Sequence, residues 1–158
     1  MVQAVRGVVR DPSDETIHVG PLVIRFLVSG ADSGGSLAMF ECGVPGGEPI
    51  PAPSHSHDGF EETIYGLEGV LTWTVDGAPV EIGPRQVLCI PRGAVHRFDN
   101  HGAADAKVLI VATPGVFGPA YFREIAAVMA DAAGGPPDHA RMGEVLRRHG
   151  LTPALSGT

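Results

Sequence analysis

The sequence predicts an all-β protein, an antiparallel jelly-roll β-barrel with a short helical appendage at its C-terminal end. Short apolar segments recur along the chain, and the 22 glycines and 14 prolines show no collagen-like period. Closely spaced short strands favour a sandwich or barrel over a chain of alternating strands and helices. The hairpin spacing matches an antiparallel jelly roll, which needs about eight strands.

Turns rich in glycine, proline and aspartate separate the predicted strands. Asp76-Gly77 is a strong signal for a two-residue hairpin turn. Residues 45–53 are too rich in proline for a central strand, because proline lacks the N–H donor, so we expect an edge or loop leading to His55. The predicted strands are residues 22–29, 36–44, 61–65, 71–75, 78–82, 87–90, 95–98 and 107–112.

The pattern changes after residue 114. Apolar residues at helical spacing predict a helix over about residues 119–132, with Pro119 in its first turn. Asp138 is the expected N-cap of a second helix, and Gly150 lies at the expected C′ position just after it. We expect both helices to pack on the barrel as a lid or a dimer-facing appendage. The predicted divisions are a barrel over residues 1–113, helices over 114–150 and a flexible tail over 151–158.

Composition and charge restrict the classes of function. With 44% apolar and 18% charged residues, the chain is predicted to fold as one packed soluble domain. A net charge of −7 without a lysine or arginine block argues against nucleic-acid binding, and no apolar run is long enough to cross a membrane. Residues 1–10 lack the apolar core of a signal peptide. Cys42 and Cys89 lie in strand-like segments and are expected to be buried free thiols, which favours a cytoplasmic protein.

Three of the seven histidines are placed so that they could meet around a metal ion. His55 and His57 are two residues apart, so on an extended segment both side chains point to the same side. Glu62 follows after the Asp58-Gly59 turn, and a barrel could bring the strand that carries His96 alongside. Three imidazoles and a carboxylate suit Fe, Mn, Co, Ni, Cu or Zn. The remaining histidines are expected on the surface: His18, His101, His139 and His149.

The framing of the histidine pair resembles the first motif of the cupin superfamily. That motif runs glycine, His-x-His, three or four residues, glutamate, six residues, glycine. The chain matches it at Gly47, His55, His57, Glu62 and Gly69, although Gly47 is farther from the histidines than usual. The spacing to Gly69 selects Glu62 over its neighbour as the motif glutamate.

The second cupin motif, Pro-x-Gly-x2-His-x3-Asn, is matched by Pro91, Gly93, His96 and Asn100. The glycine that usually opens this motif, six positions before the proline, is Arg85 here. Both departures alter loops and leave the metal-ligand positions in place. The resemblance covers about residues 20–113.

The resemblance implies that the protein binds one divalent transition metal and forms a homodimer. The metal could be Fe, Mn, Ni, Co, Cu or Zn. The implied ligands are His55, His57, Glu62 and His96. Glu62 is also the group expected to take a proton from a bound hydroxyl. Ile64, Trp73 and Phe98 are expected pocket walls, with ordinary barrel core as the alternative for each.

Three activities are compatible with this site. The first is a mononuclear metal dioxygenase acting on an aromatic or enolic small molecule, because the C-terminal pattern is similar to that of quercetinase-like cupins. The second is redox-neutral isomerisation, cyclisation or decarboxylation on the same metal, for which Arg92 and Arg97 are the nearby basic residues. The third is a metal-binding or ligand-sensing module without turnover. Fold alone does not decide among them.

Overall fold

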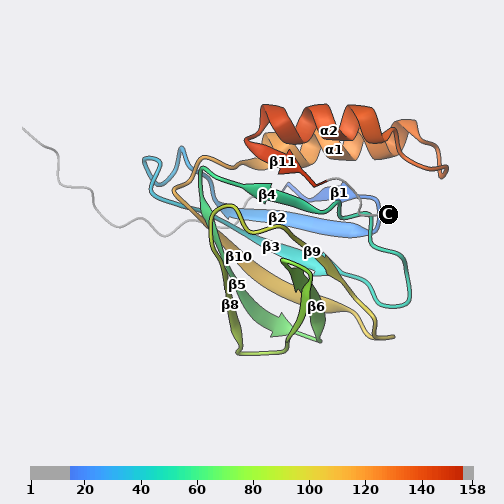
Figure 1. Cartoon of the computed structure of the whole chain (residues 1–158), viewed down its shortest axis with the longest axis horizontal. Coiled ribbons are helices and arrows are strands. Elements are labelled where there is room, and N and C mark those ends of the chain that lie inside the picture. Colours follow the sequence, from blue (N-terminus) through green and yellow to red (C-terminus); the bar gives the residue numbers. More distant parts are fainter. Residues whose placement is uncertain (1–14, 155–158) are drawn as a thin grey trace, which may run out of the picture.

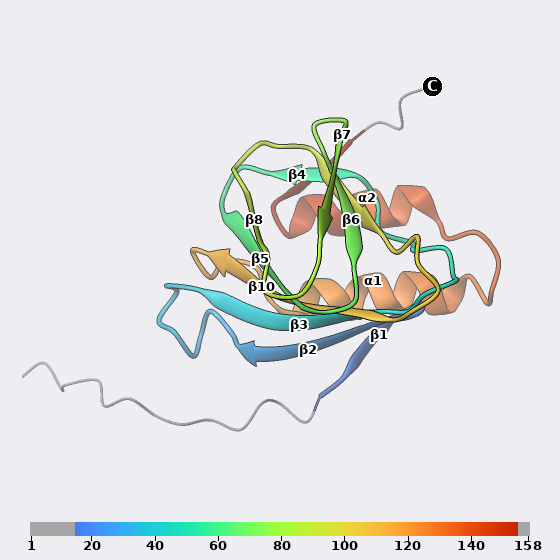
Figure 2. The same cartoon turned by 90° about the horizontal axis from the view of Figure 1, so that it is seen from below.

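The computed structural model describes residues 15–154, which form two antiparallel sheets and two helices (Figure 1, Figure 2). This arrangement confirms the predicted all-β jelly roll with short C-terminal helices. The six-stranded sheet contains, in spatial order, β1 (Ile17–Val19), β2 (Leu22–Val28), β3 (Ala38–Val44), β10 (Ala106–Thr113), β5 (Glu61–Glu68) and β8 (Val87–Ile90).

The five-stranded sheet carries the histidines. Asp76 and Gly77 join two of its strands with φ angles of 47° and 83°, the positive values that a tight hairpin turn requires, so the predicted hairpin is confirmed. In spatial order the sheet contains β11 (Leu151–Pro153), β4 (His55–His57), β9 (His96–Asp99), β6 (Leu71–Val75) and β7 (Ala78–Ile82).

Strand alternation builds the core between the two sheets. Every second residue of β3 and β10 is buried, as the two-residue period of a strand with one solvated face demands. Phe40 on β3, Ile64 on β5 and Trp73 on β6 are each at most 2% exposed. The interior of the barrel is therefore apolar, and any polar group that enters it needs a partner.

The two helices lie together beside β1 and β11 (Figure 1). Helix α1 (Pro119–Asp131) agrees with the predicted helix to within one residue and buries Tyr121 and Ile125. Helix α2 (His139–Arg148) has Asp138 as its N-cap, whose side chain accepts hydrogen bonds from two backbone N–H groups of the first turn. No helix within residues 15–154 is long and apolar enough to span a membrane.

The predicted flexible tail is wrong for residues 151–153. These residues form β11, and Leu151 is 3% exposed and registered opposite His57. A three-residue strand is too short to produce a recognisable period in the sequence. Residues 155–158 lie outside the described residues, as do residues 1–14 at the start of the predicted barrel.

Two further side chains differ from expectation. Cys42 is buried as predicted, but Cys89 is exposed, because it points outward from β8 at the edge of the sheet. His149 is not a free surface residue: its side chain is 20% exposed, and its Nε2 lies 2.9 Å from a carboxylate oxygen of Glu124 on α1. The other three histidines expected on the surface, His18, His101 and His139, are exposed.

We expect Leu151→Ala to lower the free energy of unfolding by about 2–5 kcal/mol, because it removes a buried side chain from the edge of the barrel. The matched control is Thr152→Ala, an exposed position on the same strand, with an expected change within about 0.5 kcal/mol. Urea denaturation of the two variants measures both values. Equal losses would show that β11 does not contribute buried packing.

Candidate metal centre

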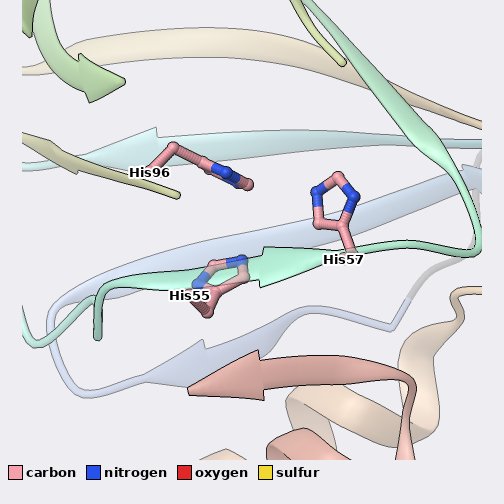
Figure 3. A group of neighbouring side chains, drawn as sticks. All are labelled: His55, His57 and His96. Atoms are coloured by element: carbon pink, nitrogen blue, oxygen red, sulfur yellow. The ribbon is translucent and has the colours of Figure 1, made fainter. Parts of the chain in front are cut away.

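Strand register brings the predicted ligands together from both sheets. His55 on β4 is registered opposite His96 on β9, and His57 lies on the same face of β4 as His55. The three imidazole rings turn toward one another (Figure 3). Glu62 approaches from the six-stranded sheet, where β5 lies between β10 and β8. Four residues from three strands, β4, β5 and β9, therefore meet inside the barrel.

The cluster has the dimensions of a site for a single ion. One nitrogen from each of the three histidines lies within 4.8 Å of the others, so the three could hold a metal. The Glu62 Oε2 lies 3.4 Å from the Nε2 of His96 and 3.7 Å from the Nε2 of His57. Its neighbour Glu61 instead forms a two-point ion pair with Arg92 on the surface, as the motif spacing predicts.

Backbone carbonyls fix the tautomers of the three histidines. Each Nδ1 lies 2.7–3.0 Å from a carbonyl oxygen, those of Pro53, Phe60 and Ala94. A carbonyl oxygen only accepts, so each Nδ1 carries the proton and each Nε2 presents a lone pair. This is the arrangement by which metal-binding histidines are commonly oriented.

Two of these lone pairs have no partner. The Nε2 atoms of His57 and His96 are buried, and no donor within residues 15–154 reaches them. Unpaired buried polar atoms are costly, and lone pairs that converge beside a carboxylate are matched by a cation. The donor set of three imidazole nitrogens and one carboxylate therefore fits a divalent transition metal.

Burial and mutual charge set the protonation states. Burial, and then the nearby His96, lower the pKa of His55 to about 4. For His96, burial acts to lower the pKa, but the contact with the Glu62 carboxylate outweighs it and raises the pKa. For Glu62, burial acts to raise the pKa, but His57 and His96 together hold it well below its usual range. The site thus contains an ionised carboxylate and a neutral His55 near neutral pH.

A ring stack holds His57 in place. Its imidazole lies parallel to the phenyl ring of Phe60, with centroids 3.9 Å apart and an interplanar angle of 10°. Phe60 in turn stacks on Phe117, whose centroid is 5.4 Å away. The two contacts connect the metal-ligand position to the segment that precedes α1.

The candidate ligands open onto a cavity of about 80 Å³. His55, Glu62 and His96 line it, while His57 is completely buried behind it. Of the three predicted wall residues, Trp73 and Phe98 line the cavity, and Ile64 is buried in the core without lining it.

Sequence reasoning missed the part of the cavity wall that comes from the C-terminal segment. Phe117, Tyr121 and Phe122 line the cavity from α1 and the residues before it. The aromatic spacing was visible in the sequence, but only the docking of α1 shows that these rings face the metal site. Phe122 also contacts the rings of Phe26 and Phe40 in the six-stranded sheet.

Comparison with known proteins identifies the family. The Cupin domain family matches residues 40–112, a range that contains all four candidate ligands. Residues 40–112 are a Cupin domain. A curated relative of this cupin, quercetin 2,3-dioxygenase from Bacillus subtilis (strain 168), is 29% identical over 124 residues, which are 77% of the chain and 35% of that protein. The chain spans about a third of that relative's length, and the predicted resemblance to quercetin dioxygenase-like cupins is confirmed.

Solved structures agree with this assignment. The polyketide cyclase RemF from Streptomyces resistomycificus is 29% identical, with a TM-score of 0.51 over 60% of this cupin and 66% of that chain. A predicted oxalate decarboxylase from Thermotoga maritima is 24% identical, with a TM-score of 0.58 over 68% of this cupin and 99% of that chain. The second likeness shows the shared fold.

Removing a group that hydrogen-bonds to a metal ligand commonly lowers metal affinity about 10- to 100-fold. We expect His96→Ala to lower metal affinity by more than that, because it removes one of the converging ligand nitrogens. The matched control, His101→Ala, removes an exposed imidazole outside the cluster and leaves metal content unchanged. Elemental analysis after dialysis against limiting metal compares the variants. Equal losses would remove His96 from the ligand set.

We also expect metal affinity to fall as the pH is lowered from about 8 to 6, near the ordinary titration range of histidine. The raised pKa of His96 means that protons compete with the metal at that ring, while the lowered pKa of His55 keeps it available as a ligand. Competition titrations with a chelator at several pH values measure the slope. An affinity independent of pH across this range would contradict the assigned protonation of His96.

Proposed function

We propose that this cupin is a metal-dependent enzyme that acts on a small aromatic or enolic molecule, and that its reaction is a dioxygenation of the quercetinase type. One observation carries the proposal: the unpaired nitrogens and the ionised carboxylate of the centre adjoin a cavity with aromatic walls. The curated relative from Bacillus subtilis, a quercetin 2,3-dioxygenase, supports the same class of substrate.

The chemistry of the cavity wall supports an aromatic substrate over a sugar phosphate. Rings of Phe40, Trp73, Phe117 and Phe122 line the cavity and offer flat apolar surfaces for stacking. Among the described lining residues, Arg97 is the one arginine, and none is a lysine. Arg92, the other arginine near the second motif, is held at the surface by Glu61. A phosphate group would find few charged partners here.

Glu62 has the properties of the catalytic base. Its carboxylate is ionised, it lines the cavity, and its side chain is 12% exposed. A substrate hydroxyl that enters the cavity can therefore give its proton to an Oε atom of Glu62. Phe117 and Phe122 line the same cavity and add apolar surface beside this position. A bound transition metal would supply Lewis-acid polarisation of the substrate oxygen and, if redox-active, reactivity toward dioxygen.

A redox-neutral cyclisation is the second candidate. The observation that favours it is the similarity to the polyketide cyclase RemF, which is as identical to this cupin, at 29%, as the dioxygenase is. An aromatic cavity and an ionised Glu62 also suit proton removal from a polyketide-like substrate without oxygen. The two reactions differ in whether dioxygen is consumed.

The expected result is oxygen uptake with quercetin by the wild-type protein and a loss of about 10²–10⁴-fold per bound metal in Glu62→Gln, because the variant lacks the proton acceptor. The control is Glu61→Gln, which makes the same charge change at the exposed neighbouring position and is expected to retain activity. An oxygen electrode and elemental analysis on the same samples give rate and metal content.

Other outcomes decide among the alternatives. Product formation under nitrogen with a polyketide-like substrate would replace the dioxygenase by the redox-neutral reaction. Firm metal binding, with Glu62→Gln indistinguishable from wild type for every substrate, would instead indicate a binding module without turnover.

A further inference from the structure

A third buried nitrogen without a partner lies next to the metal centre. Besides the two histidine Nε2 atoms, the Nε of Arg97 is buried, and no acceptor within residues 15–154 reaches it. Its chemistry is opposite to theirs, because a guanidinium is always protonated and its Nε–H can only donate. A cation satisfies the histidines, whereas Arg97 requires an acceptor oxygen.

Arg97 faces a groove on the outer side of the five-stranded sheet. It follows His96 on β9 and is registered opposite Thr74 on β6. Because side chains alternate along a strand, Arg97 points away from the face that carries His96 and Phe98. The groove measures about 920 Å³ and lies between this sheet and α2, from which His139 and Arg147 line it.

The groove and the metal cavity meet at Arg97. Three residues line both hollows: Ala52, Pro53 and Arg97. The pairing of β4 with β9 consists of one registered pair, His55 with His96. The cavity of about 80 Å³ holds only a fragment of a molecule, since small-molecule sites commonly measure about 300–1,000 Å³. The groove has room for the rest.

The charges around the groove favour an anion. Arg97 and Arg147 face it, with Glu144 as the acidic residue of the described lining. Asp99 accepts a hydrogen bond from the Nη2 of Arg97 at 2.6 Å and occupies only one of the nitrogens of the guanidinium. The Nε is itself buried, but 41% of the side chain is exposed, so guanidinium N–H groups other than the Nε–H can reach a ligand oxygen, and a carboxylate is a strong charge-assisted match for them.

We propose that Arg97 forms a carboxylate-binding subsite, so that the ligand of this cupin is an aromatic acid whose ring enters the metal cavity and whose carboxylate binds in the groove. This inference rests on the proposed function for the role of the cavity and adds the substrate class. Arg97 then acts as a specificity-determining residue that makes the protein bind an aromatic acid more tightly than its uncharged counterpart.

The test compares 3-phenylpropionate with its uncharged counterpart, 3-phenylpropanamide. Trp73 is the single tryptophan of the chain and lines the cavity, so its fluorescence reports binding there. We expect the purified protein to bind the acid at least about tenfold more tightly than the amide, and Arg97→Gln to abolish that preference. Arg92→Gln is the matched control: it makes the same charge change at an arginine of similar exposure, 48% against 41%, and is expected to keep the preference.

Metal content is measured in every sample, and the titrations are repeated after chelation. An acid preference that persists without metal and disappears in Arg97→Gln supports the subsite. Equal affinities for acid and amide in the wild type overturn it, whether or not Arg97→Gln folds. A preference that disappears on chelation but survives in Arg97→Gln also overturns it, because the carboxylate then binds the metal. Absence of oxygen uptake would contradict the proposed dioxygenase reaction. The comparison of acid and amide binding would still test the Arg97 subsite.

Discussion

The structure depends on one constraint: three imidazoles, two of them buried and one half-buried, have their Nδ1 protons already committed to backbone carbonyls. The opposite nitrogens must therefore converge as lone pairs in an apolar interior, beside the ionised Glu62. Such an arrangement is unfavourable by itself and becomes favourable with a cation at its centre. The carbonyls that set the tautomers lie in loops and turns of the barrel. The fold therefore prepares the histidines to bind a metal, in addition to supplying the ligands themselves.

The sequence predicted the clustering of these side chains because each lies in a short motif with a recognisable spacing. The two-residue step between His55 and His57 guarantees a common face, and the motif spacing selected Glu62, which the structure brings to the histidines, over Glu61, which it leaves at the surface. The fold class followed from the turns and the alternation. These features depend on neighbours in the chain, which a pattern can record.

The errors concern contacts between distant segments. The sequence gives no period for a three-residue strand such as β11, and the exposure of Cys89 follows from the edge position of β8. The second face of the cavity was also missed, because it depends on where α1 docks. Ile64 was expected as a pocket wall, with barrel core as the alternative, and the structure places it in the core. Register and docking decide such positions, and a single sequence does not encode them visibly.

The pairing of β11 with β4 has a consequence for what counts as one folding unit. The strand that carries His55 and His57 has a single registered pair with β9 and three with β11, so its main backbone support comes from the end of the chain. The matched family range, residues 40–112, is therefore smaller than the cooperative unit. Transplanting that range alone into another protein would leave an uncovered sheet edge at the histidine strand, a surface prone to pair with other chains.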